Sequence, residues 1–158
     1  MADASLLTML DEIRGKTLQV LQGVSDAQAR WAPRGLQNTI LWHAGHSYIV
    51  VEWLSLTLMG RAPLAPEGWF SMFSWESRPA EVAADRWPAL SVVVTELEEQ
   101  HRRLRDVIGM LSDEQIARQS SSNSNRTVRS SIIHGLHDEA CHTGEMLLLK
   151  KLLRVGFV

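Results

Sequence analysis

The sequence predicts an all-α protein, a four-helix bundle with a long aromatic-rich connection between the second and third helices. Apolar residues recur three and four positions apart along most of the chain, and the alternation typical of strands is missing from the sequence. Four of these stretches are long enough to run the length of a bundle. The 158 residues suit one domain over residues 1–158, since a typical domain takes roughly 100–200 residues.

The first two helices are predicted from apolar faces bounded by end signals. The first has Asp3 or Ser5 as its cap and ends near Gly23. Its core face is Leu6, Leu10, Ile13, Thr17 and Leu21. The second is expected to begin at Asn38, a good cap residue, and to run to Gly60. Its core face is Ile40, Ala44, Ser47, Val51, Leu54 and Leu58.

The third and fourth helices are predicted from the same kind of apolar spacing. The third has a seam with alternating spacings of three and four, typical of a helix packed lengthwise against its neighbours. The seam positions are Trp87, Leu90, Val94, Leu97, His101, Leu104, Ile108 and Leu111. Pro88 fits such a helix only in its first turn, because proline lacks an N–H. The fourth helix runs from about Thr127 to Leu153, and its core side is Ile133, Leu136, Ala140 and Leu147.

Two connections are long. Residues 61–84 contain three prolines and four large aromatic residues. Long ordered loops in compact domains are often functional, so this segment is either a lid or binding loop, or a crossover that caps the bundle or packs in a dimer contact. Residues 119–127 are rich in Ser and Asn and are expected to form a mobile surface loop.

A weak internal repeat supports an architecture of two halves. Ser25–Gln28 after the first helix resembles Ser112–Gln115 after the third. Trp42–His46 then resembles Ile133–His137 in the following helices. The same order in both halves makes chance a weaker explanation than it would be for either similarity alone.

Composition excludes several classes of function. The 16 Lys and Arg against 18 Asp and Glu give a formal net charge of -2, which removes the electrostatic drive for nucleic acid. No stretch reaches the ~20 apolar residues that span a bilayer, and the start lacks the basic residues of a secretory signal. The lone Cys141 excludes an internal disulfide and suits a reducing compartment. We expect a cytoplasmic protein without nucleic-acid or membrane partners.

Five of the six histidines fall in two short windows, and they indicate a metal site. His43 and His46 are one turn apart on the second helix, and Asp138 and His142 share a face of the fourth. Neighbouring helices can therefore point imidazoles and carboxylates into one cavity, and zinc and nickel accept both groups. Three protein ligands leave a position open for water or substrate. His101 has no ligand partner at helical spacing and is expected to lie outside the site.

Two motifs resemble those of DinB-like proteins. Asn38–His46 (NTILWHAGH) is similar to their second-helix motif, in which a Trp precedes a ligand His by four residues. Asp138–Glu145 (DEACHTGE) is similar to their fourth-helix motif, usually His-x-x-x-His-x-Gly-Gln. The Ser-Asp-x-Gln element before each motif-bearing helix also recurs in that family. The resemblance extends from Leu6 to Leu153.

The resemblance implies a four-helix bundle that holds a divalent metal with three side chains, and zinc and nickel are the metals that suit the residues present. Carried over by position, the ligands are His46, Asp138 and His142, with Asp138 standing where the family usually has a histidine. A carboxylate can replace an imidazole as a ligand. His137 in place of Asp138 would lie five residues from His142, which aligns less well on one helix face. The other histidines of the two windows are expected beside the metal or at the substrate: His43, His134 and His137.

The family resemblance also implies a function. Characterised members include S-transferases that join a low-molecular-weight thiol to an electrophile, and a thiol-dependent isomerase. A metal-bound thiol would react as the thiolate, since coordination lowers its pKa. Metal-dependent hydrolysis, a non-catalytic metal or small-ligand binding protein of a stress response, and a plain interaction domain are the alternatives. We expect a small-molecule substrate, such as a cellular thiol, and a homodimer, because the family commonly pairs its bundles.

Four further positions lie within the two motifs. Cys141 precedes His142, and because adjacent helical residues diverge by about 100°, it is expected to face the core rather than act as a nucleophile. Gly45 and Gly144 lie inside helices, where glycine costs ~1 kcal/mol relative to alanine, and close packing beside the site would explain both. The final Gln of the usual fourth-helix motif is Glu145 here.

Overall fold

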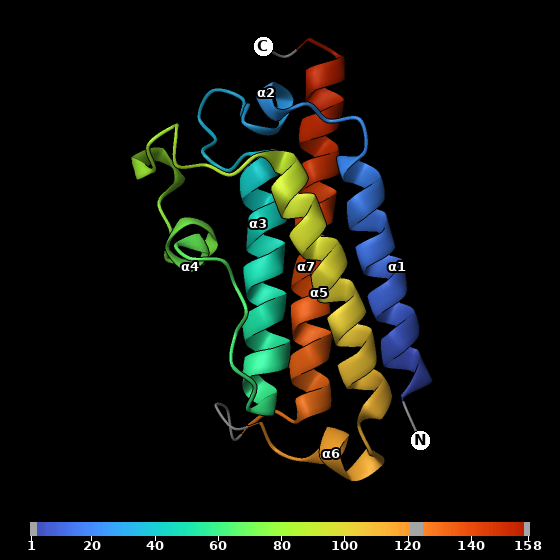
Figure 1. The fold of residues 1–158 in the computed structure, drawn as a ribbon. Coiled ribbons are helices and arrows are strands. Elements are labelled where there is room, and N and C mark those ends of the chain that lie inside the picture. The colour runs from blue at the N-terminus through green and yellow to red at the C-terminus, as the bar shows by residue number, and fades with distance from the viewer. Residues whose placement is uncertain (1–2, 121–124, 157–158) are drawn as a thin grey trace.

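Four long helices form the protein, as the computed structural model shows for residues 3–120 and 125–156 (Figure 1). The described residues contain no strand beyond one isolated bridge between Gln119 and Thr127, so the predicted all-α four-helix bundle is confirmed. The long helices are α1 (Ala4–Leu21), α3 (Ile40–Val51), α5 (Leu90–Met110) and α7 (Val128–Arg154). A π-helical turn, Glu52–Leu56, and a 3-10 turn, Thr57–Met59, extend α3.

The ends of the long helices follow the side-chain caps. Asp3 caps α1, as expected. Thr39, not Asn38, caps α3, because its hydroxyl accepts the backbone N–H of Trp42. Helix α5 begins two residues after Pro88, so this proline lies outside the helix and costs it no hydrogen bond.

In the structure, the first part of the internal repeat forms the N-termini of two similar short helices. In Ser25–Gln28 and in Ser112–Gln115 the serine hydroxyl accepts the glutamine N–H, while the glutamine side chain accepts the serine N–H. These two capping boxes open the short helices α2 (Asp26–Ala29) and α6 (Asp113–Ala117). The two short helices lie at opposite ends of the bundle (Figure 1).

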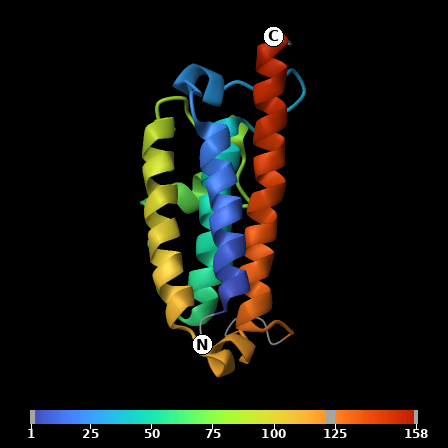
Figure 2. The same cartoon turned by 90° about the vertical axis from the view of Figure 1, so that its right-hand side faces the viewer.

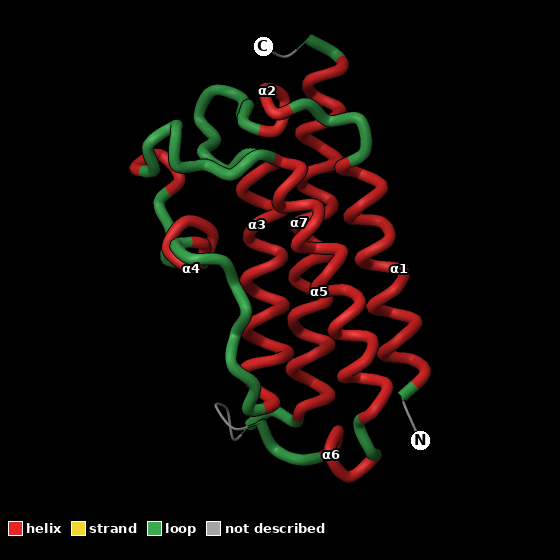
Figure 3. The backbone as a smooth tube through the Cα atoms, viewed as in Figure 1, coloured by secondary structure: helices red, strands yellow, loops and turns green. Residues whose placement is uncertain are grey.

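The connection in residues 61–84 determines the topology. It contains α4 (Trp69–Phe73) and a 3-10 turn, Pro79–Glu81, and it runs along α3 back to the end where α3 began (Figure 3). Helices α3 and α5 therefore run in the same direction, while α1 and α7 run in the opposite one (Figures 1 and 2). The connection is ordered because Trp69, Met72 and Phe73 are buried.

The core face of α7 differs from the prediction. Leu136 is buried and Ile133 and Leu147 are half-buried, but Ala140 is exposed. The buried line instead includes the polar residues Glu139 and Thr143. An apolar pattern cannot detect a face that is buried through polar pairs, which explains the error.

Glu139 and Thr143 are buried because α1 presents matching partners. Glu139 accepts two hydrogen bonds from Arg14, at 2.7 and 2.9 Å, and a third from Thr17. Arg14 also donates to the carbonyl oxygen of Leu97 on α5. Arg14 and Glu139 are both fully buried, so the pair is a polar centre within the bundle.

The predicted face of α3 is buried except for Leu54, which is half-buried, and Leu58, whose side chain lies outside the described part of the structure. Part of the expected loop at residues 119–127 also lies outside it, at positions 121–124. Among the described residues, no helix combines the length and apolar character needed to cross a membrane.

Candidate metal centre

Side chains from α3 and α7 meet between these two helices. The Nε2 atom of His46 lies 3.7 Å from Oδ2 of Asp138, and the Nε2 atom of His142 lies 3.5 Å from the same oxygen. Ligands bound at 2.0–2.2 Å with tetrahedral angles lie about 3.4 Å apart. The three predicted ligand residues are therefore brought together at spacings that fit one cation.

The orientation of His46 is set by the connection. Its Nδ1 lies 2.5 Å from the carbonyl oxygen of Phe73, which can only accept, so Nδ1 donates. Burial lowers the pKa of His46, and the Phe73 carbonyl opposes part of this shift. The neutral ring thus keeps its lone pair on Nε2, the atom that faces Asp138.

The ring of Trp42 packs against one face of the His46 ring. The two rings are stacked, with centroids 4.5 Å apart and planes inclined by 19°. The indole N–H of Trp42 donates to Oγ of Ser77 at 2.9 Å. Ser77 and Phe73 both belong to the connection, so this segment positions His46 from two sides.

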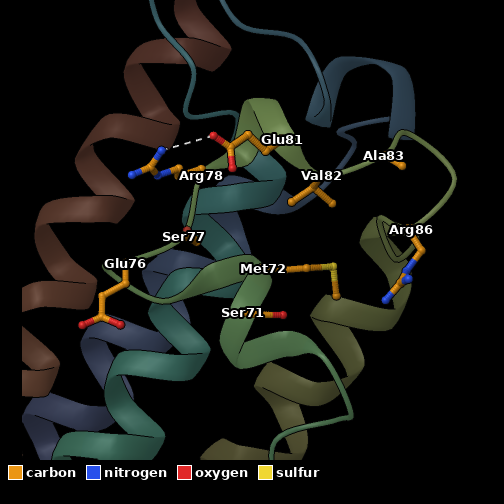
Figure 4. A pocket seen from close by; sticks show the side chains of 9 residues that line it. All are labelled: Ser71, Met72, Glu76, Ser77, Arg78, Glu81, Val82, Ala83 and Arg86. Atoms are coloured by element: carbon orange, nitrogen blue, oxygen red, sulfur yellow. Dashed lines mark hydrogen bonds and ion pairs between the residues drawn. The ribbon is translucent and has the colours of Figure 1, made fainter.

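Ser77 also lines a cavity of about 560 Å³, whose lining residues all come from the segment that joins α3 to α5 (Figure 4). An ion pair between Arg78 and Glu81 lies at the rim of this cavity. The cavity is lined by Ser71, Met72, Glu76, Ser77, Arg78, Glu81, Val82, Ala83 and Arg86. None of the candidate ligands lines it, so its relation to the site is the hydrogen bond that the indole N–H of Trp42 donates to Ser77.

One carboxylate oxygen of Asp138 is the strongest indication of a cation in this site. Its Oδ2 is buried and has no hydrogen-bond partner among the described residues. Both Nε2 atoms that face it lie beyond hydrogen-bond distance, and the one on His46 is itself an acceptor. A buried carboxylate oxygen without a donor is costly, and a cation at this point would remove that cost.

A second group of ligand atoms adjoins the first. The Nδ1 atom of His43 lies 2.8 Å from Nδ1 of His142 and 3.0 Å from Oε2 of Glu145, and the latter two atoms are 3.2 Å apart. Burial, with the neighbouring His142 and His46, lowers the pKa of His43 to about 3. From the sequence, Glu145 was recognised only as a departure from the usual Gln, although its spacing of three from His142 could have indicated a place beside that histidine.

The remaining histidines do not join these groups within the described structure. His134 and His137 are exposed, and Nε2 of His137 lies 3.9 Å from the sulfur of Cys141. Cys141 is exposed, contrary to expectation, because α7 turns Glu139 to the core instead. His101 pairs with Asp11 at 2.8 Å, outside the site as predicted.

The two helical glycines near the motifs differ. A Cβ atom on Gly45 would lie 2.4 Å from the ring of Phe73, so glycine is needed for the connection to approach α3. This part of the prediction is confirmed. A Cβ atom on Gly144 would meet nothing within 4 Å, so close packing does not explain that glycine.

Comparisons with known proteins agree with the motifs. Residues 9–146 match the family model of the DinB superfamily. The chain is also similar to a solved structure, described as a conserved protein of locus from Enterococcus faecalis, with a TM-score of 0.77 and 17% identity over 99% of each chain. A search of curated proteins gave no match. The structural likeness concerns the fold, whereas the family match covers most of the sequence: this chain belongs to the DinB superfamily.

Proposed function

We propose that this protein is a divalent-cation-dependent enzyme in which His46, Asp138 and His142 hold the cation. The observation that carries the proposal is the buried Oδ2 of Asp138, which faces two imidazole nitrogens and has no hydrogen-bond donor. Two imidazoles and one carboxylate are a donor set that zinc and nickel accept. Three protein ligands also leave a position for a substrate atom.

Neighbouring residues of the chain orient the ligand atoms of this set. The carbonyl of Phe73 selects the tautomer of His46 with a free Nε2, and Trp42 holds the ring plane. The carboxylate of Glu145 lies 3.2 Å from Nδ1 of His142, which favours a proton on Nδ1 and a lone pair on Nε2. Both Nε2 lone pairs are then directed at the carboxylate of Asp138.

The proposed reaction is the transfer of a small cellular thiol to an electrophile. When bound, the cation would lower the pKa of the thiol and so supply a thiolate at neutral pH. His43, kept neutral by a pKa of about 3, can accept or donate a hydrogen bond beside the substrate without adding charge. Thiol transferases occur among the DinB-like proteins that the motifs resemble, which supports this reaction, and hydrolysis by a cation-bound water is the alternative.

Cation content of the untagged protein tests the site. After dialysis against a chelator and reloading with zinc or nickel, the wild type should retain about one cation per chain. Asp138→Ala and His142→Ala should both reduce this content strongly, whereas His101→Ala, which changes a histidine paired with Asp11, should leave it unchanged. Less than about a tenth of an equivalent in the wild type would contradict the proposal.

A thiol-consumption assay tests the reaction. Loaded protein is mixed with monochlorobimane and each of several cellular thiols, with Asp138→Ala as the matched control. The proposal predicts a rate above that control for at least one thiol. Equal rates with every thiol, in protein that holds its cation, would favour a non-catalytic binding protein instead.

The expected homodimer stays a prediction. Light scattering of the purified protein should give the mass of two chains, and the mass of one chain would contradict it.

A further inference from the structure

His142 faces ligand atoms on two sides. Its Nε2 faces Asp138, and its Nδ1 faces His43 and Glu145. We propose that His43, His142 and Glu145 form a second binding position for a divalent cation, which shares His142 with the position proposed above. The inference rests on the proposed function only through this shared ring.

The geometry of the second position supports a cation. Ligands bound at 2.0–2.2 Å and separated by 90–109° lie about 3.0–3.4 Å apart. The three edges of this group, 2.8, 3.0 and 3.2 Å, are close to that range. The side chain of Glu145 is 56% exposed, so it can adjust by the few tenths of an ångström required, while His43 is held in place by burial.

The donor chemistry of the second position matches that of the first. Each group contains two imidazole nitrogens and one carboxylate oxygen. The Nδ1 atom of His43 faces both other ligand atoms, so a lone pair on this nitrogen would point to the same cation. Glu145 supplies the negative charge at a position where the resembling family usually has a neutral Gln.

A cavity gives this group access to the outside. Its volume is about 310 Å³, and both His43 and Glu145 line it. A hydrated ion can therefore approach His43 and Glu145 without passing the buried Oδ2 of Asp138.

The shared ring makes the two positions compete. A neutral imidazole has a lone pair on one nitrogen only. The first position needs it on Nε2 of His142, and the second needs it on Nδ1. In the wild type, the first position should take the cation, and removal of Asp138 should free the ring to serve the second.

Titration with Co(II), followed by visible absorption, tests the inference on chelator-treated protein. Asp138→Ala should still bind one Co(II), at least about tenfold more weakly than the wild type. Adding Glu145→Gln should weaken this remaining binding by at least about tenfold, because the substitution removes the charged ligand. Adding His43→Gln should do the same. His142→Ala should lose both binding events, since both positions use its ring.

The matched control is Asp138→Ala combined with Glu98→Gln, which neutralises an exposed glutamate on α5. It should bind Co(II) like Asp138→Ala alone, and circular dichroism shows that each variant keeps its helices. No Co(II) bound by Asp138→Ala, or binding that Glu145→Gln leaves unchanged, would overturn the second position and leave these three residues joined by hydrogen bonds. Wild-type affinity no higher than that of Asp138→Ala would instead contradict the first position, so the two failures are distinguishable.

Discussion

Asp138 and Glu139 are adjacent carboxylates with opposite surroundings. Glu139 faces the core and accepts hydrogen bonds from Arg14 and Thr17. Asp138 has a buried oxygen with no donor. Neighbouring residues of a helix point about 100° apart, so one carboxylate can stabilise the bundle while the other faces the site. The difference in partners separates a structural carboxylate from a candidate ligand.

The two helical glycines provide a matched pair of substitutions. Gly45→Ala should lower the free energy of unfolding by about 1–3 kcal/mol, because the new methyl group overlaps the ring of Phe73. Gly144→Ala meets open space and should raise it by up to ~1 kcal/mol through helix propensity. Urea unfolding of chelator-treated protein measures both. Equal effects at the two positions would contradict the packing described here.

Because His43 is buried, we expect the folded protein to be less stable in mild acid. Its pKa is about 3 in the folded chain, against an ordinary value of 6.5. Between these values the unfolded chain binds a proton that the folded chain does not, so the free energy of unfolding falls as the pH falls. One such histidine should lower the free energy of unfolding by about 2 kcal/mol as the pH falls from 7 to 5.

His43→Gln removes the titrating group and is the control for this prediction. In urea unfolding of chelator-treated protein, the variant should lose less stability between pH 7 and pH 5 than the wild type does. Burial lowers the pKa of His46 as well, so part of the slope should remain in the variant. An identical slope in both proteins would show that His43 is protonated equally in the folded and unfolded chains.

At the scale of elements, a buried ion pair joins α1 to α7. Glu139→Leu leaves the guanidinium of Arg14 without its carboxylate in the core and should cost about 3–5 kcal/mol. The double change Arg14→Met with Glu139→Leu removes both charges, and it should recover most of that loss. A double-mutant cycle by urea unfolding measures the coupling. Additive losses would contradict a paired centre.

The connection between α3 and α5 has a defined structural role. Its Phe73 carbonyl orients His46, and its Ser77 hydroxyl holds Trp42 against that ring. From the sequence, this segment could be a lid or binding loop, or a crossover. It is a crossover that also positions a candidate ligand, and no pattern of residue types could show this, because a backbone carbonyl has no sequence signature.

For the molecule as a whole, the fold was predictable and the polar contacts were not. Spacings of three and four predicted the four helices, and the two capping boxes follow directly from Ser25–Gln28 and Ser112–Gln115. The face of α7 was predicted wrongly because Glu139 is buried by a partner far away in sequence. Helical spacing predicted that His46 and His142 would meet, but it could not predict that Glu145 would reach His43 on another helix.

Anomalous scattering tests the central claim most directly. Crystals of the untagged protein, loaded with zinc or nickel, are measured on both sides of the absorption edge. We predict a strong peak about 2.0–2.2 Å from Nε2 of His46, Oδ2 of Asp138 and Nε2 of His142. The absence of any peak between these three atoms in loaded crystals, with the metal found elsewhere or nowhere, would contradict the account.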